Sequence, residues 1–167
     1  FVVVKFFHRS ITGVRSVAFR DHKEANRPYP NMSDNAAGIK QLVAERPYLD
    51  GTRVGASIHS SLTTGLGVLT DPDVYTVGVA MNSISNSRLL GSMSCVYGGT
   101  DVPPFEDFAS QLRGRLFLIA GMLDPVLPVA NTFRLVEALQ KENKTFDMLI
   151  LPNFGHEMSD YVIRRTW

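Results

Sequence analysis

Three polar residues that lie far apart in the chain have the types and the order needed for acyl transfer. Ser60, Asp124 and His156 each follow a short apolar run that is expected to form a strand. A serine hydroxyl is a weak nucleophile at neutral pH, so a histidine must take its proton and an acid must orient the imidazolium. The sequence therefore predicts that Ser60 attacks a carbonyl carbon, and that the backbone N–H of Ser61 supplies half of an oxyanion hole.

Each of these residues also has an ordinary structural explanation. A serine, aspartate or histidine at the end of a strand is more often a cap or a turn residue. Ser57 is a second serine in the first of these runs, but it lies inside the expected strand. Glu157 is expected to be an acid at the start of a helix, where negative charge suits the amino terminus, rather than a second group that orients His156.

The hydrophobic pattern predicts the elements that must position these residues. Apolar and β-branched runs indicate strands, and apolar residues near helical spacing indicate helices between them. The predicted strands cover residues 1–7, 52–59, 74–81, 115–120 and 146–151, and the predicted helices cover residues 33–46, 62–69, 131–142 and the segment after His156. Alternation of this kind is typical of an α/β fold with three layers, in which helices cover both faces of a mostly parallel sheet. The carboxyl ends of its strands hold the working residues.

Composition limits the function without identifying it. The 167 residues are 44% hydrophobic and 20% charged, which predicts one soluble globular domain. A net charge of +1 with scattered basic residues argues against nucleic acid as a partner. Cys95 is the single cysteine, and no Cys/His spacing suits zinc, so neither a metal nor a cofactor is predicted. The apolar runs are shorter than the roughly 20 residues of a membrane span, and the compartment stays open.

Six segments of the chain carry a family resemblance. They are residues 18–21 (AFRD), 46–55 (RPYLDGTRVG), 70–80 (TDPDVYTVGVA), 131–139 (NTFRLVEAL), 146–152 (FDMLILP) and 161–167 (YVIRRTW). Together they resemble the α/β-hydrolase peptidase domain of the prolyl oligopeptidase family, in particular its dipeptidyl-peptidase IV branch. The resemblance implies a serine peptidase that removes dipeptides from the amino termini of peptides, with Ser60, Asp124 and His156 as nucleophile, acid and base.

The same resemblance implies partners and further site residues. A peptide would be the substrate, a β-propeller domain is expected in the parent protein, and a homodimer is the oligomer to consider. Tyr97 is the remaining candidate from a tyrosine-rich segment that in relatives lines the pocket for the penultimate proline. Since the chain opens without Met inside an apolar run, we expect residues 1–167 to be a partial catalytic domain that is truncated on its amino-terminal side.

The chain departs from the family pattern around two of the three residues. Relatives have Gly-x-Ser-x-Gly at the nucleophile, whereas this chain has Ile58 and Leu62 in place of the two glycines. Those glycines relieve steric crowding in a strained turn between strand and helix. After Asp124 the chain continues Pro-Val-Leu-Pro128, without the polar residues of relatives. The second hypothesis is therefore a catalytically impaired scaffold or binding domain of the same fold.

Overall fold

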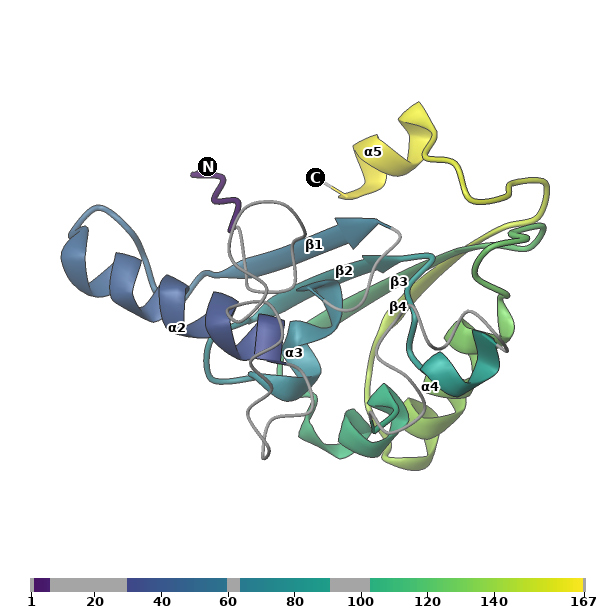
Figure 1. Cartoon of the computed structure of the whole chain (residues 1–167), viewed down its shortest axis with the longest axis horizontal. Helices are drawn as coiled ribbons and strands as arrows, with labels where there is room; N and C mark the ends of the chain where they lie inside the picture. The colour runs from purple at the N-terminus through teal and green to yellow at the C-terminus, as the bar shows by residue number, and fades with distance from the viewer. Residues whose placement is uncertain (1, 7–29, 60–63, 91–102, 167) are drawn as a thin grey trace, which may run out of the picture.

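The computed structural model describes residues 2–6, 30–59, 64–90 and 103–166. Its centre is a sheet of four parallel strands that follow one another in chain order (Figure 1). The strands are β1 (Gly55–His59), β2 (Val77–Met81), β3 (Arg115–Gly121) and β4 (Asp147–Leu151). These strands correspond to four of the five runs predicted from the sequence, and the prediction of a mostly parallel α/β fold is confirmed.

Helices cover both faces of this sheet. They are α2 (Pro30–Glu45), η1 (Thr64–Leu66), α3 (Gly67–Thr70), η3 (Phe105–Gln111), α4 (Ala130–Lys141) and α5 (Asp160–Thr166). In Figure 1, α2, α3 and α4 lie below the sheet and α5 lies above it. The arrangement has three layers, as the alternation of apolar runs predicts.

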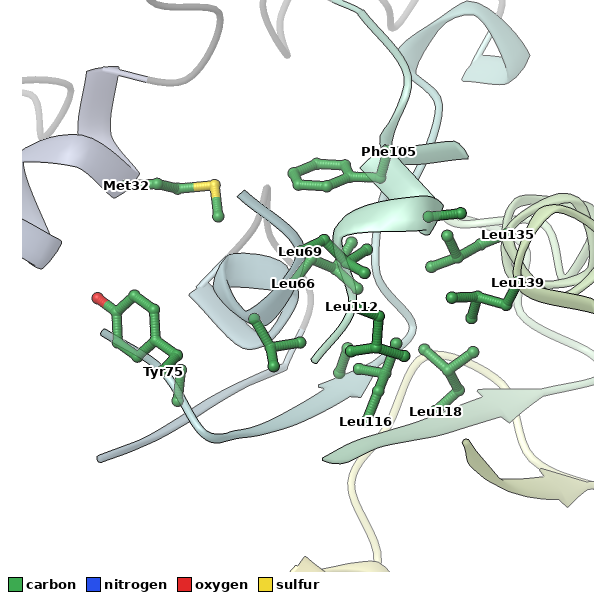
Figure 2. Packing of buried hydrophobic residues seen from close by; sticks show 14 of the residues in the cluster. Met32, Leu66, Leu69, Tyr75, Phe105, Leu112, Leu116, Leu118, Leu135 and Leu139 are labelled. Carbon is green, nitrogen blue, oxygen red and sulfur yellow. The ribbon is translucent and has the colours of Figure 1, made fainter. Parts of the chain in front are cut away.

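The larger part of the core lies between the sheet and the helices of the first face. Leu116 and Leu118 of β3 point toward this face and pack with Leu135 and Leu139 of α4, and with Phe105 of η3 (Figure 2). Each of these side chains is at most 2% exposed. Burying a side chain of this size stabilises the fold by about 1.5–3 kcal/mol, so this layer accounts for much of the stability.

A smaller core lies on the other face, beneath α5. Because successive strand residues point to opposite faces, Ile119 of β3 joins this second cluster together with Leu151 of β4 and Val162 of α5. The guanidinium of Arg165 lies 6.0 Å from the centre of the Phe117 ring on the same face. The last helix is therefore packed onto the sheet through apolar and cation–π contacts.

Backbone approaches backbone closely where the helical segment after β1 crosses β2. A Cβ built on Gly65 would lie 2.1 Å from the carbonyl oxygen of Val79, and one on Gly78 would lie 2.2 Å from the carbonyl oxygen of Gly65. A glycine costs about 1 kcal/mol relative to alanine within a helix. The close packing on β2 offsets that cost, and it fixes the position of η1 against the sheet.

One expectation about the elements is wrong. Residues 2–6 do not form a strand in the structure, and Val2 and Val3 are 62% and 78% exposed. A strand needs a hydrogen-bonded neighbour, and within the described residues this segment has no place in the sheet. The segment after Pro104, for which no helix was predicted, forms η3, whose Phe105 is fully buried. Among the described residues, no helix is both long enough and apolar enough to cross a membrane.

Candidate active site

Asp124 and His156 lie beyond the carboxyl ends of two neighbouring strands. In the parallel register, Gly121 at the end of β3 stands opposite Leu151 at the end of β4, so both strands finish at one edge of the sheet. Asp124 follows β3, and His156 follows β4. The strand β1 ends at the same edge, directly before Ser60. The positions of Ser60, Ser61 and Tyr97 lie outside the described residues.

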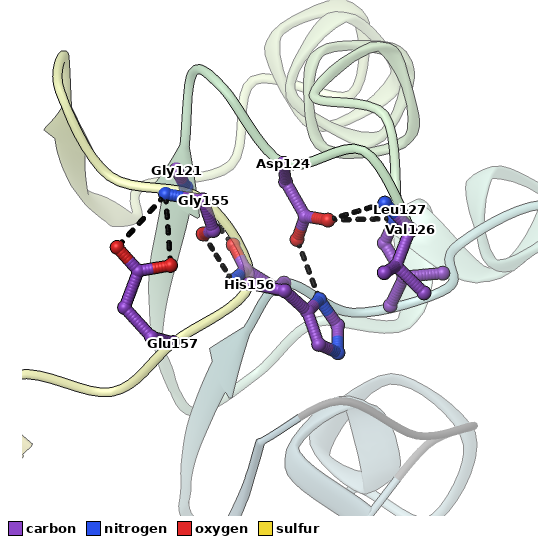
Figure 3. A network of polar contacts seen from close by, with 8 residues as sticks. Gly121, Asp124, Val126, Leu127, Gly155, His156 and Glu157 are labelled. Carbon is purple, nitrogen blue, oxygen red and sulfur yellow. Dashed lines mark hydrogen bonds and ion pairs between the residues drawn. The ribbon is translucent and has the colours of Figure 1, made fainter.

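Asp124 and His156 form a close pair across this edge. The Nδ1 atom of His156 lies 2.7 Å from Oδ2 of Asp124 (Figure 3). The aspartate side chain is fully buried, whereas the histidine side chain is 24% exposed. A carboxylate can only accept, so Nδ1 carries the proton of this hydrogen bond. In the neutral ring the lone pair is then on Nε2, which is the arrangement a general base requires.

The second oxygen of Asp124 is held by the main chain of its own turn. Oδ1 accepts hydrogen bonds of 2.8 Å from the N–H groups of both Val126 and Leu127. Such charge-assisted bonds orient the carboxylate before any substrate arrives. Asp124 is thus a turn former and the partner of His156 at the same time, so the structural explanation and the catalytic one do not exclude each other.

The apolar residues that follow Asp124 form a small core of their own. Leu127 is 3% exposed and packs with Ile84 and Leu90 from the segment after β2. Val126 packs against the same cluster. The apolar residues of this turn therefore contribute packing, while the hydrogen bonds to Oδ1 of Asp124 come from the backbone.

Gly155, the residue before His156, is held on both sides of its Cα. The N–H of Gly155 donates to both carboxylate oxygens of Glu157, at 3.1 and 3.2 Å (Figure 3). The carbonyl oxygen of Gly155 accepts a 3.2 Å hydrogen bond from the side-chain amide of Asn82. The prediction that Glu157 starts a helix is wrong, because α5 begins at Asp160. Its carboxylate instead stabilises the loop that carries the histidine.

The end of β3 and the histidine loop also touch through their backbones. The N–H of Leu123 donates to the carbonyl oxygen of Phe154 at 3.0 Å. A Cβ on Gly121 would lie 2.3 Å from the carbonyl oxygen of Gly155, closer than atoms can approach. Glycine at position 121 therefore allows the acid turn and the histidine loop to lie against each other.

A buried polar cluster lies beside the site, between the segment after β2, η3 and α4. The Oδ1 atom of Asn131 accepts from the N–H of Asn86, whose amide in turn donates to Glu106 at 3.2 Å. Burial raises the pKa of Glu106, although the hydrogen bond from Asn86 and the charge of Arg134 act in the opposite direction. This cluster fixes the loop that packs under the acid turn.

Asn82 is the residue of this region that sequence reasoning missed. It follows β2 directly, and no role was predicted for it. Its signal in the sequence is weak, because an asparagine after a strand is typical of many turns. Within the described residues, no cluster of three His, Cys, Asp or Glu side chains is suited to hold a metal ion.

The parallel sheet, its helices on both faces and the residues beyond the strand ends define a domain of the α/β-hydrolase type. The model of the prolyl oligopeptidase family matches residues 100–166, and the resemblance inferred from the sequence is thereby confirmed. The match includes both the acid turn and the histidine loop.

Solved structures with the same fold include three peptidases. Porphyromonas gingivalis dipeptidyl peptidase 4 superposes with a TM-score of 0.78 at 22% identity, over 89% of this chain and 23% of that one. Pyrococcus horikoshii acylaminoacyl peptidase gives 0.68 at 17% identity, over 81% and 24%. A puromycin-hydrolysing peptidase of Mycobacterium tuberculosis gives 0.70 at 19% identity, over 84% and 24%. The chain spans about a quarter of the length of these structures.

Proposed function

We propose that this chain is the catalytic portion of a serine peptidase in which Ser60, His156 and Asp124 act as nucleophile, base and acid. The observation that carries the proposal is the 2.7 Å contact between His156 Nδ1 and the fully buried carboxylate of Asp124. This contact lies at the edge where β1 ends one residue before Ser60. The family match over residues 100–166 supports the same reaction class.

The proposed reaction has two halves. The hydroxyl of Ser60 attacks the carbonyl carbon of the peptide bond, and its proton passes to Nε2 of His156. Asp124 stabilises the imidazolium, and the N–H of Ser61 donates to the oxyanion. His156 then gives the proton to the leaving amine, and an acyl-enzyme remains on Ser60. Water, deprotonated by His156, hydrolyses this ester and restores the hydroxyl.

The proposed substrate is a peptide, from which the enzyme would release a dipeptide at the amino terminus. The resemblance to the dipeptidyl-peptidase branch and the likeness to a dipeptidyl peptidase 4 structure support this substrate class. Tyr97 is the proposed contact for the side chain next to the cleaved bond. For the whole protein, a β-propeller domain and a homodimer stay predictions.

The alternative function is a scaffold or binding domain that has lost catalysis. Ile58 and Leu62, which stand where relatives have glycine, favour this alternative. A Cβ at either position crowds the turn that presents the serine. The Asp124–His156 pair argues for the enzyme, because a scaffold has no need of a histidine held in the tautomer of a base.

A fluorophosphonate probe separates the two functions, since it reacts with an activated serine and leaves an ordinary serine unmodified. We expect the folded chain to be labelled and Ser60→Ala to abolish labelling. Ser57→Ala is the matched control, because Ser57 is an exposed residue inside β1, opposite Val79. Labelling that survives Ser60→Ala, or a folded chain that is not labelled at all, would refute the proposed peptidase.

A further inference from the structure

Asn82 joins the two loops that carry the acid and the histidine. Its Oδ1 atom accepts a 2.9 Å hydrogen bond from the N–H of Gly121, at the end of β3. Its Nδ2 atom donates to the carbonyl oxygen of Gly155 at 3.2 Å. Its own N–H donates to the carbonyl oxygen of Ile119 at 2.9 Å. The residue is 3% exposed, so water competes little for these groups.

The chemistry at this position suits asparagine and few other residues. One neighbour needs an acceptor and the other needs a donor, and a side-chain amide supplies both. The backbone of Asn82 is left-handed, with φ at 44°, a conformation that asparagine tolerates better than most residues. Glycine would adopt this backbone easily, but it would leave the buried N–H of Gly121 and the partly buried carbonyl of Gly155 without this partner.

Gly155 is where Asn82 can influence the chemistry. Glu157 holds the N–H of Gly155, which belongs to the peptide unit before this residue, and Asn82 holds the carbonyl oxygen, which belongs to the peptide unit between Gly155 and His156. With both peptide units held, the backbone of Gly155 cannot rotate freely, although glycine itself would permit rotation. His156 is the next residue, so a rotation of the Gly155 backbone would move the imidazole relative to the carboxylate of Asp124.

We propose that Asn82 is a positioning residue of this site: its amide ties the Gly155 peptide to the end of β3 and thereby sets the contact between His156 and Asp124. The catalytic consequence rests on the serine peptidase proposed above. The geometric consequence does not, because the hydrogen bond between the two side chains can be observed without turnover.

The test uses Asn82→Gly, with Asn143→Gly as its matched control. Asn143 is also left-handed, with φ at 52°, but it is exposed and lies just beyond α4, away from the site. The two substitutions relieve the same backbone conformation, and Asn82→Gly alone removes an amide from the site. The first readout is the nuclear magnetic resonance signal of the His156 Nδ1 proton and its exchange with solvent. The second is the rate of fluorophosphonate labelling.

We expect Asn82→Gly to remain folded by circular dichroism while the Nδ1 proton exchanges about ten times faster and labelling slows by about 10- to 100-fold, since a displacement of about 1 Å can have that effect. Asn143→Gly should change neither readout. An unchanged proton signal and labelling rate in folded Asn82→Gly would overturn the proposal.

Two further outcomes keep the proposal separate from the proposed function. If the wild-type chain is not labelled, but its proton signal is lost in Asn82→Gly and kept in Asn143→Gly, the positioning role stands and the peptidase fails. If Asn82→Gly does not fold, Asn82→Asp decides. Aspartate keeps the acceptor for Gly121 but places a carboxylate oxygen against the carbonyl of Gly155, so we expect the proton signal to weaken. A wild-type signal in Asn82→Asp would overturn the positioning role.

Discussion

The carboxylate of Asp124 contacts an imidazole on one side and two backbone N–H groups on the other. This double contact allows a substitution that changes one function and spares the other. In Asp124→Asn the amide oxygen can still accept from Val126 and Leu127, so the turn should persist. The amide nitrogen would then face Nδ1 of His156 and favour the tautomer that cannot act as a base.

We therefore expect Asp124→Asn to slow labelling by fluorophosphonate by about 10³- to 10⁴-fold, with little change in the temperature of unfolding. The labelling rate tests the first expectation, and thermal unfolding followed by circular dichroism tests the second. A variant that unfolds easily would show that the amide oxygen does not maintain the turn. A variant that labels like wild type would contradict the role of Asp124 as the acid.

Glu106 makes a second prediction at the scale of one residue. Burial raises the pKa of its carboxyl group in the folded chain. A raised pKa means that the fold prefers the protonated form, so this stabilisation is present below the ordinary pKa and is lost as pH rises through the folded value. We expect Glu106→Gln, which keeps an acceptor for Asn86, to lose less stability than wild type between about pH 4 and 7.

Urea unfolding at a series of pH values measures this difference in the free energy of unfolding. Glu137→Gln is the control, because Glu137 lies on an exposed turn of α4 and Lys141 lowers its pKa. The pKa of Glu137 shifts in the opposite direction, so its charged form stabilises the fold. Glu137→Gln should therefore lose at least as much stability as wild type when the pH rises. Parallel pH profiles for wild type and Glu106→Gln would contradict the prediction.

At the scale of the elements, η1 lies so close to β2 that Gly65 has no room for a side chain. A Cβ on Gly65 would clash with the backbone of β2, whereas one on Gly55 meets no atom closer than 3.8 Å. We expect Gly65→Ala to reduce the free energy of unfolding by about 1–3 kcal/mol, as overpacking does, and Gly55→Ala to change it little. Denaturant unfolding of both variants provides the comparison. Equal stabilities would mean that the helical segment is not held against β2.

The sequence predicts most elements because each of them has a strong local signal. The apolar runs of β2, β3 and β4 and the helical spacing of α4 suffice to locate them within a few residues. The predicted strand ends were sufficient to select Ser60, Asp124 and His156 as candidates. The structure brings Asp124 and His156 together. Local signals failed where tertiary contacts decide.

The failures have physical reasons that a single sequence does not reveal. The apolar segment 2–6 has the composition of a strand, but a strand also requires a neighbour, which composition cannot supply. Glu157 and Asn82 act through hydrogen bonds to Gly155, a contact that for Asn82 joins positions 73 residues apart. The Oδ1 atom of Asp124 is held by backbone N–H groups, which every sequence possesses. Long-range polar contacts therefore account for most of what the sequence leaves open.

For the whole molecule, the edge of the sheet at β1 is the feature with the largest consequence. Among the described residues β1 pairs with β2 alone. Beside it lies a groove of about 570 Å³, lined by apolar side chains that include Val4, Leu42 and Val54. An unpaired strand edge next to apolar surface promotes pairing between chains.

We expect the 167-residue chain to associate increasingly at higher concentration, and we expect Ser57→Lys to reduce this association. Ser57 is exposed on β1, and a lysine on an edge strand disfavours strand pairing. Size-exclusion chromatography with light scattering across a range of concentrations measures the effect. A chain that stays monomeric, or a Ser57→Lys variant that associates equally, would contradict the role of this edge.

The backbone hydrogen bonds of Asp124 have a consequence for how such proteins diverge. Because main-chain amides hold the carboxylate, the residues after it are free to drift from polar to apolar without dislodging it. A sequence comparison that counts the identities of those neighbouring residues would therefore underestimate how well the geometry around Asp124 is kept. The carboxylate can keep its position in the structure after the sequence motif around it has changed.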